Sequence, residues 1–158
     1  MATAYLGLGT NIGNLEQNIA LALEKIHERI GEITSQSSLY STRPWGFESP
    51  NMFLNAVCAV ETELTPHELL SQCQVIERKL GRRNKSKDGH YQDRVIDIDV
   101  LLYDDQVISY PDMTVPHPLM TQRAFVMDPM AEIAPRLRHP QSGLTMAEIS
   151  KALDEQEG

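Results

Sequence analysis

Apolar and polar residues alternate along four stretches of the chain, at residues 2–8, 33–40, 52–63 and 94–103. Side chains two apart on a strand share a face, so each stretch predicts a β-strand. Between them lie two stretches with apolar residues at helical spacing. The first follows Asn14, a predicted N-cap, and ends at Gly31. The second starts at Thr65-Pro66-His67-Glu68, the residues of a capping box with proline at the first helical position.

The resulting order, β-α-β-β-α-β, predicts an α+β protein with a ferredoxin-like core and an antiparallel sheet. In that arrangement the first and fourth strands lie near one another. An irregular C-terminal extension is expected to hold a short strand at 107–109, an extended segment at 114–118, a short helix at 119–126 and a closing helix at 144–153. The length of 158 residues fits a single domain, residues 1–158.

The fourth strand carries two acidic residues at alternate positions, Asp97 and Asp99. Together with Leu101 they are predicted to share one face, separated by roughly 6.5 Å along the strand. The core face takes the other apolar residues, namely Ile96, Ile98, Val100 and Leu102. Two such carboxylates can bind one hard cation or a pair of them. Two like charges on a half-buried strand need a counter-charge, and the nearest candidates are Mg²⁺, Arg94 or both. The alternative is that the two aspartates form the polar side of an amphipathic strand.

Charge is distributed unevenly along the chain. The net charge of −8 argues against a general nucleic-acid binder. Nevertheless, cations gather just before the paired aspartates, at Arg78, Lys79, Arg82, Arg83, Lys85, Lys87 and Arg94. This segment is predicted to bind a small polyanion, the alternative being a solvated surface loop.

Other segments leave alternatives open. The glycines of residues 7–14 permit a tight turn and close approach of the backbone to a ligand, but the segment lacks the Gly-x-Gly-x-x-Gly spacing of a dinucleotide site. Trp45, in the loop 41–51, can stack on a planar ligand or fill the core. Asn55 suits the edge of a heterocycle or a structural hydrogen bond. On their own, Gln74 and Glu77 are predicted to face solvent.

Two cysteines, Cys58 and Cys73, fall in apolar patterns without metal-type spacing. They are expected to be free, buried thiols of a cytoplasmic protein. The sequence shows no apolar run of membrane-spanning length and no signal-peptide pattern.

Six motifs, in this order and spacing, resemble the 6-hydroxymethyl-7,8-dihydropterin pyrophosphokinase family. The match covers nearly the whole chain and consists of residues 5–11, 38–42, 53–56, 97–102, 115–118 and 123–125. The resemblance implies transfer of pyrophosphate from ATP to the hydroxymethyl group of a reduced pterin, with release of AMP.

The resemblance also implies roles for individual residues. Asp97 and Asp99 would bind two Mg²⁺ ions, while Arg82 and Arg94 would grip the phosphates. The pterin contacts would be Thr42, Arg43, Pro44, Trp45, Gly46, Phe53, Asn55 and Phe125. The ATP contacts would be Gln74, Glu77, Arg83, Lys85, Tyr91, Ile98, Thr114, His117 and Arg123.

The chain departs from the family pattern in several places. Gln92-Asp93-Arg94 replaces the usual Gly-Pro-Arg, Tyr91 stands where Trp is frequent, and Phe53 stands where Tyr is common. No activated Ser or Cys nucleophile is apparent, so no covalent intermediate is expected.

Two rival functions remain: a ferredoxin-like nucleotide- or RNA-binding module and an inactive relative that serves as an oligomer partner. The first needs exposed aromatics on the sheet. The protein is expected to be a monomer that can dock with other folate-pathway enzymes.

Overall fold

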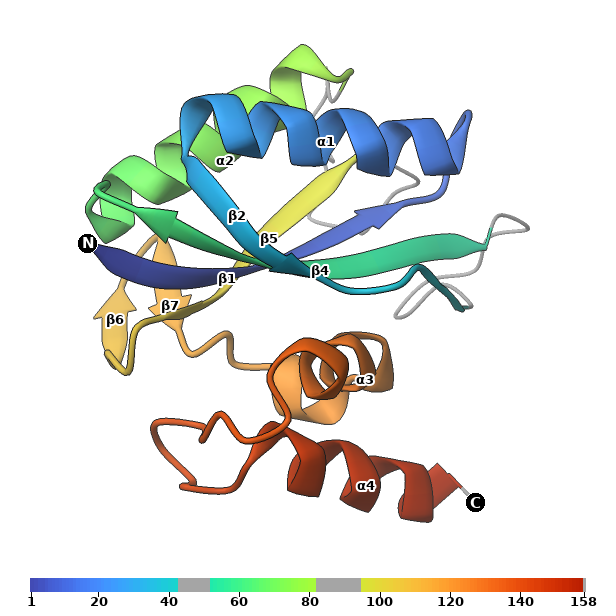
Figure 1. The fold of residues 1–158 in the computed structure, drawn as a ribbon, viewed down its shortest axis with the longest axis vertical. Coiled ribbons are helices and arrows are strands. Elements are labelled where there is room, and N and C mark those ends of the chain that lie inside the picture. The colour runs from blue at the N-terminus through green and yellow to red at the C-terminus, as the bar shows by residue number, and fades with distance from the viewer. Residues whose placement is uncertain (43–51, 82–94, 158) are drawn as a thin grey trace.

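The computed structural model describes residues 1–42, 52–81 and 95–157. Within them an antiparallel sheet has α-helices on both faces (Figure 1). The strands are β1 (Ala2–Thr10), β2 (Gly31–Gln36), β3 (Tyr40–Thr42), β4 (Phe53–Thr62), β5 (Asp97–Tyr103), β6 (Ile108–Tyr110) and β7 (Met113–Val115). The helices are α1 (Leu15–Arg29), α2 (Pro66–Lys79), the 3₁₀ turn η1 (Met120–Gln122), α3 (Ala124–Ile133) and α4 (Met146–Glu157).

The main sheet has the order β2-β4-β1-β5, and the short β3 pairs with the start of β4. All of its pairings are antiparallel. The expected neighbourhood of the first strand and the aspartate strand is confirmed, because β1 pairs directly with β5. Strands β6 and β7 form a separate two-stranded ribbon.

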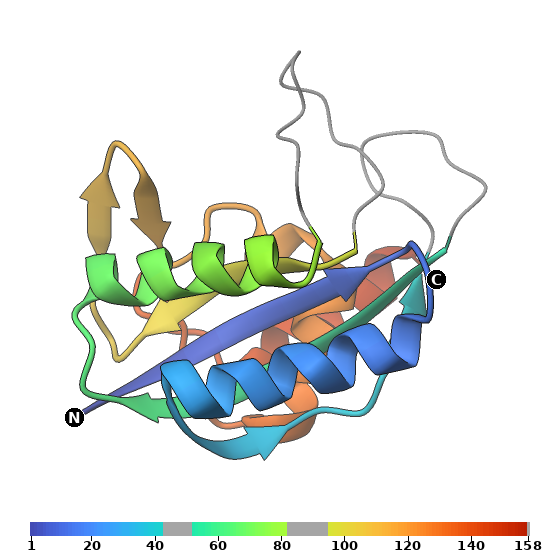
Figure 2. The same cartoon turned by 90° about the horizontal axis from the view of Figure 1, so that it is seen from above.

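Helices α1 and α2 lie side by side over one face of the sheet; α3 lies against the other face, and α4 packs on α3 (Figures 1 and 2). The first core includes Leu6, Ile26 and Ile76, all fully buried. The second includes Leu101 and Met127. Because helices cover both faces, the described chain lacks the open sheet surface that an RNA-binding module uses. No helix in the described residues is long and apolar enough to cross a membrane.

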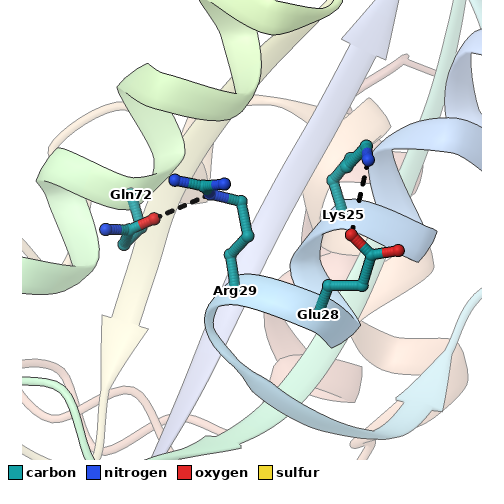
Figure 3. Close-up of polar contacts among 4 residues, drawn as sticks. All are labelled: Lys25, Glu28, Arg29 and Gln72. Carbon is teal, nitrogen blue, oxygen red and sulfur yellow. Dashed lines mark hydrogen bonds and ion pairs between the residues drawn. The ribbon is translucent and has the colours of Figure 1, made fainter.

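Capping residues in the sequence determine where α1 and α2 begin. The Asn14 side chain accepts a hydrogen bond from the Gln17 amide at 3.1 Å, as expected of an N-cap. Thr65 and Glu68 form the predicted capping box at the start of α2. Arg29 Nε donates to Gln72 Oε1 at 3.0 Å and so links the two helices, as Figure 3 shows. The nearby Lys25–Glu28 ion pair lies within α1 and is partly exposed, so it adds little stability.

The prediction that Leu102 faces the first core is wrong. The β1–β5 register shifts between Tyr5 and Leu6, which pair with Leu102 and Val100. This β-bulge adds one residue to β5 and turns Leu102, like Leu101, toward α3 and α4.

Other element boundaries also differ from expectation: β5 begins at Asp97 and not at 94, and α4 runs from Met146 to Glu157 and not over 144–153. Strand 33–40 is interrupted because the Ser37 hydroxyl accepts a hydrogen bond from the Val57 amide at 2.9 Å and ends β2. The first strand runs on to Thr10, so Gly7 and Gly9 lie inside it, and only Gly13 has a positive φ in the turn that follows. The short helix expected at 119–126 is η1 followed by α3, whose buried Met127 and Met130 favour continuation to Ile133.

Replacing Gly31 by Ala should destabilise the fold, because a Cβ there would lie 1.9 Å from the backbone oxygen of Glu61 on β4. We expect Gly31→Ala to lower the free energy of unfolding by about 2 kcal/mol or more, measured by urea denaturation. Gly143→Asn is the matched control. Position 143 has a φ of +75° and no atom within 4 Å of an added Cβ, and Asn tolerates that backbone conformation. Equal stability of Gly31→Ala and wild type would contradict the packing described.

Candidate active site

Two rows of residues run across the sheet near the C-terminal end of β1. In the first row Gly9 pairs with Asn55 on one side and Asp97 on the other. In the second row Gly7 pairs with Val57 and Asp99. Paired residues on adjacent strands lie on the same face, so both aspartates face the side that α3 and α4 cover, as their alternation predicted. Both are only partly buried.

The two glycines differ in what occupies the space above them. At Gly7 the Leu101 side chain already fills it, with atoms 3.4–3.6 Å from the position of an added Cβ. At Gly9 the neighbours of that position are Asn55 Oδ1 at 3.3 Å and a Phe53 ring carbon at 3.7 Å. Gly9 therefore forms a flat floor between an amide and a carboxylate. The sequence predicts close approach of a ligand to the backbone at these glycines but assigns them to a turn, whereas Gly9 lies inside β1.

The Asn55 side chain is buried, and its amide nitrogen is held by β3. It donates to Thr42 Oγ1 at 2.8 Å and, more weakly, to the Tyr40 carbonyl at 3.4 Å. Of the two roles considered for Asn55, the structural hydrogen bond is therefore confirmed for its side-chain nitrogen. These bonds orient the side chain so that its oxygen faces the floor at Gly9.

Glu77 is buried, so the expectation from the helical pattern alone that it faces solvent is wrong. Its Oε2 accepts a hydrogen bond from the Ile98 amide at 2.8 Å. Strand β5 is an edge strand, and the backbone N–H and C=O of one residue point to the same side of an antiparallel strand. The Ile98 side chain lies in the core and its N–H is bound to Glu77, so only its backbone carbonyl is available to a ligand. Gln74, one turn earlier on α2, is exposed as expected.

His117 lies between groups of opposite charge. Its backbone N–H donates to the Leu101 carbonyl at 2.9 Å, and its Nδ1 accepts from the Leu119 amide at 3.2 Å. Burial lowers the pKa of His117, the Arg123 guanidinium lowers it further, and Asp97 partly offsets both effects. The imidazole is therefore neutral at pH 7. With Nδ1 accepting, the proton is assigned to Nε2, which can donate to a ligand.

Arg123 and Phe125 stand at the start of α3. The Arg123 guanidinium carbon lies 5.5 Å from the centre of the Phe125 ring, close enough for a cation–π contact. Arg123 is buried, and Phe125 packs on the edge of the second core. Thr114 is exposed on β7, three residues before His117.

Several predicted site residues lie outside the described residues. They are Arg43, Pro44, Trp45 and Gly46 of the expected pterin loop, and Arg82, Arg83, Lys85, Tyr91 and Arg94 of the cationic segment. The residues that flank these segments lie at the same end of the sheet, where β1 ends and β4 and β5 begin. Thr42 pairs with Phe53, Gly81 approaches Val95, and Thr10 Oγ1 donates to the Val95 carbonyl.

Comparison with known proteins identifies the family. A model of the 7,8-dihydro-6-hydroxymethylpterin-pyrophosphokinase (HPPK) family matches residues 5–135. The chain belongs to this family. The HPPK of Porphyromonas gingivalis, a 2-amino-4-hydroxy-6-hydroxymethyldihydropteridine pyrophosphokinase, is 47% identical over 143 residues, covering 90% of this chain and 97% of the relative. That of Aquifex aeolicus is 44% identical over 140 residues, covering 89% and 85%.

Solved structures share the fold. The crystal structure of Plasmodium falciparum HPPK-DHPS with STZ-DHP aligns with a TM-score of 0.81 at 16% sequence identity. The alignment covers 98% of this chain and 44% of that one, so this chain spans less than half of the Plasmodium protein.

The floor at Gly9 can be tested with the neighbouring glycine as a control. We expect Gly9→Ala to weaken binding of a pterin by about tenfold or more, because the added methyl group occupies the floor and displaces Asn55 Oδ1. Gly7→Ala adds the same methyl group against Leu101 and should leave pterin affinity within about twofold. Calorimetric titration of each variant measures the affinity. Equal losses in both variants would show that Gly9 has no special role.

The surroundings of His117 predict opposite pKa changes in two variants. In the metal-free protein, Arg123→Met should raise the pKa of His117 toward its ordinary value, and Asp97→Asn should lower it further. NMR titration of the imidazole carbon signals measures both, with His117→Gln identifying the signal. Because the folded pKa lies below the unfolded one, protonation favours unfolding, so this histidine costs stability as pH falls below about 6.5. Shifts of the same sign in both variants would contradict the geometry.

Proposed function

We propose that the chain catalyses its family's reaction, transfer of the pyrophosphoryl group of ATP to the hydroxymethyl group of 6-hydroxymethyl-7,8-dihydropterin, at the edge of the sheet where β1 and β5 meet. The hydroxymethyl oxygen forms a bond to the β-phosphorus and releases its proton to solvent. The bond from that phosphorus to the oxygen bridging it to the α-phosphorus breaks, and AMP leaves. The observation that supports this assignment is the row Asn55–Gly9–Asp97, where a flat heterocycle would lie over a glycine beside a carboxylate pair.

The pterin would lie over Gly9, with its polar edge toward Asn55. Phe53 from β4 and Phe125 from α3 would supply aromatic rings on the same side of the sheet. Thr42 supports this site indirectly, because it accepts the hydrogen bond that orients Asn55. Residues 43–46 would complete the contacts.

The donor set fits Mg²⁺. This cation is typically held by one or two carboxylates, together with substrate phosphates and water, rather than by a full protein cage. Asp97 and Asp99 supply two carboxylates on one face, and the described residues contain no group of three or more His, Cys, Asp or Glu that could hold a metal ion. When bound, two Mg²⁺ ions would neutralise the triphosphate and polarise its phosphorus atoms.

The chain's own residues would position ATP around that pair. A neutral His117 can donate a hydrogen bond from Nε2, and the Ile98 carbonyl points outward from the edge strand. Arg123 would supply positive charge, and Thr114, Gln74 and Glu77 would contribute further contacts to the nucleotide. Cations from 82–94, chiefly Arg82 and Arg94, would stabilise charge that develops on the transferred group.

The proposal also covers the fold type, the number of domains, the cellular location and the assembly of the protein. The strand order supports a ferredoxin-like core within one domain, residues 1–158. Two buried free thiols, Cys58 and Cys73, fit a reducing cytoplasm. We propose a monomer that can dock with other folate-pathway enzymes. The fused HPPK-DHPS chain of Plasmodium falciparum and a Folic acid synthesis protein fol1 of Pneumocystis carinii, 37% identical over 143 residues but covered over only 19% of its length, support such docking.

Removal of either carboxylate tests the metal assignment. We expect Asp97→Asn and Asp99→Asn each to lower AMP release from ATP, Mg²⁺ and the hydroxymethyl pterin by at least about 100-fold. Asp105→Asn, in the exposed turn after β5, is the matched control and should retain activity. Circular dichroism would verify that each variant is folded. Near-normal turnover in either site variant would remove that carboxylate from the proposed metal site.

A further inference from the structure

The motif Ser38-Leu39-Tyr40-Ser41-Thr42 contributes more than Thr42 to the molecule. Ser38 and Tyr40 both bind Glu132, on the last turn of α3 and 94 residues away from Ser38. The Ser38 amide donates to both carboxylate oxygens of Glu132, at 3.0 and 3.1 Å. The Ser38 hydroxyl donates to Oε2 at 2.8 Å, and the Tyr40 hydroxyl donates to Oε1 at 2.7 Å. Each carboxylate oxygen thus accepts two hydrogen bonds.

The ionisation states favour this contact at neutral pH. Burial, followed by the hydrogen bond to Glu132, raises the pKa of Tyr40 to about 12, so its hydroxyl keeps the proton that it donates. The hydrogen bonds from Tyr40 and then Ser38 lower the pKa of Glu132, so its carboxylate stays charged. Hydrogen bonds to a charged acceptor are stronger than neutral ones. The contact is nevertheless exposed, so altering it should not unfold the protein.

Strand β3 is short and depends on contacts such as that with Glu132 to stay in place. It has three residues, lies off the main strand path and pairs, within the described residues, with β4. Tyr40 stands directly opposite Asn55, and Thr42 accepts the hydrogen bond from the Asn55 amide. The connection before β3 is fixed at Ser37, which exchanges hydrogen bonds with Val57. Movement of β3 would therefore shift the group that orients Asn55.

Helix α3 carries the other side of the proposed pterin site. Phe125 lies in its first turn and Glu132 in its last, and the helix runs from one to the other, although Pro129 between them has no amide N–H to donate to the Phe125 carbonyl. The Glu132 contact therefore ties the strand that orients Asn55 to the helix that presents Phe125.

We infer that Glu132 is a positioning residue of the pterin site, which fixes β3 against α3 and so sets the distance between Asn55 and the Phe125 ring. This inference rests on the proposed pterin binding. Glu132 does not touch the substrate. Its effect should appear in the KM for the pterin, with the KM for ATP unchanged.

The test compares Glu132→Gln with Ser150→Ala. Gln keeps the size of the side chain but loses the charge, and its NH₂ group faces donors where an acceptor is needed. Ser150→Ala removes the 2.6 Å hydrogen bond from the Ser150 hydroxyl to Asp128, which ties the same helix α3 to α4 and not to β3. It therefore controls for a general loss of stability. Tyr40→Phe removes one of the four bonds and provides an intermediate case.

Steady-state AMP release and thermal melting are measured for each protein. We expect Glu132→Gln to raise the KM for the pterin about fivefold or more, with a smaller rise in Tyr40→Phe and the KM for ATP within about twofold. Ser150→Ala should lower the melting temperature without changing the KM for the pterin. An unchanged pterin KM in Glu132→Gln, or an equal rise in Ser150→Ala, overturns the inference. A wild-type protein that releases no AMP overturns the proposed function, and the inference with it.

Discussion

The antiparallel register of β1 between β4 and β5 is the constraint on which the rest of the site depends. It places Gly9 between Asn55 and Asp97 and Gly7 beside Asp99. A slip of one residue would turn every side chain of β1 to the opposite face and break both rows. Burial on both sides of the sheet prevents such a slip, because Leu6 and Leu8 fill the core under α1 and α2 while helices α3 and α4 close the other face.

Alternation in the sequence predicted the main strands and the shared face of Asp97 and Asp99, because period-two patterning is a local property of a strand. It failed where distant residues decide. The face of Leu102 depends on a bulge opposite Tyr5, and the end of β2 depends on a hydrogen bond from Val57 to Ser37. Glu77 is buried because an edge-strand amide, that of Ile98, needs an acceptor. None of these partners is visible in the local pattern.

The residues of the candidate site likewise fall into those that the sequence predicted and those that only the structure shows. Motif resemblance assigned residues such as Asn55 and Phe125, and the structure adds how they are held. The sequence predicted close approach of a ligand to the glycine backbone but placed Gly9 in a turn and not in β1. Glu132 lay outside every predicted element, and its partner Ser38 is 94 positions away, beyond any periodic pattern.

The electrostatics of the proposed site explain why its carboxylates and its cations come from different elements. Two partly buried carboxylates would repel a triphosphate, and the whole protein carries a net charge of −8. At the proposed site, ATP would therefore approach Asp97 and Asp99 together with divalent cations and nearby positive side chains that compensate. The edge strand β5 holds the two carboxylates at fixed spacing. The proposed compensating cations come from outside the sheet, from Arg123 at the start of α3 and from the predicted cationic segment 82–94.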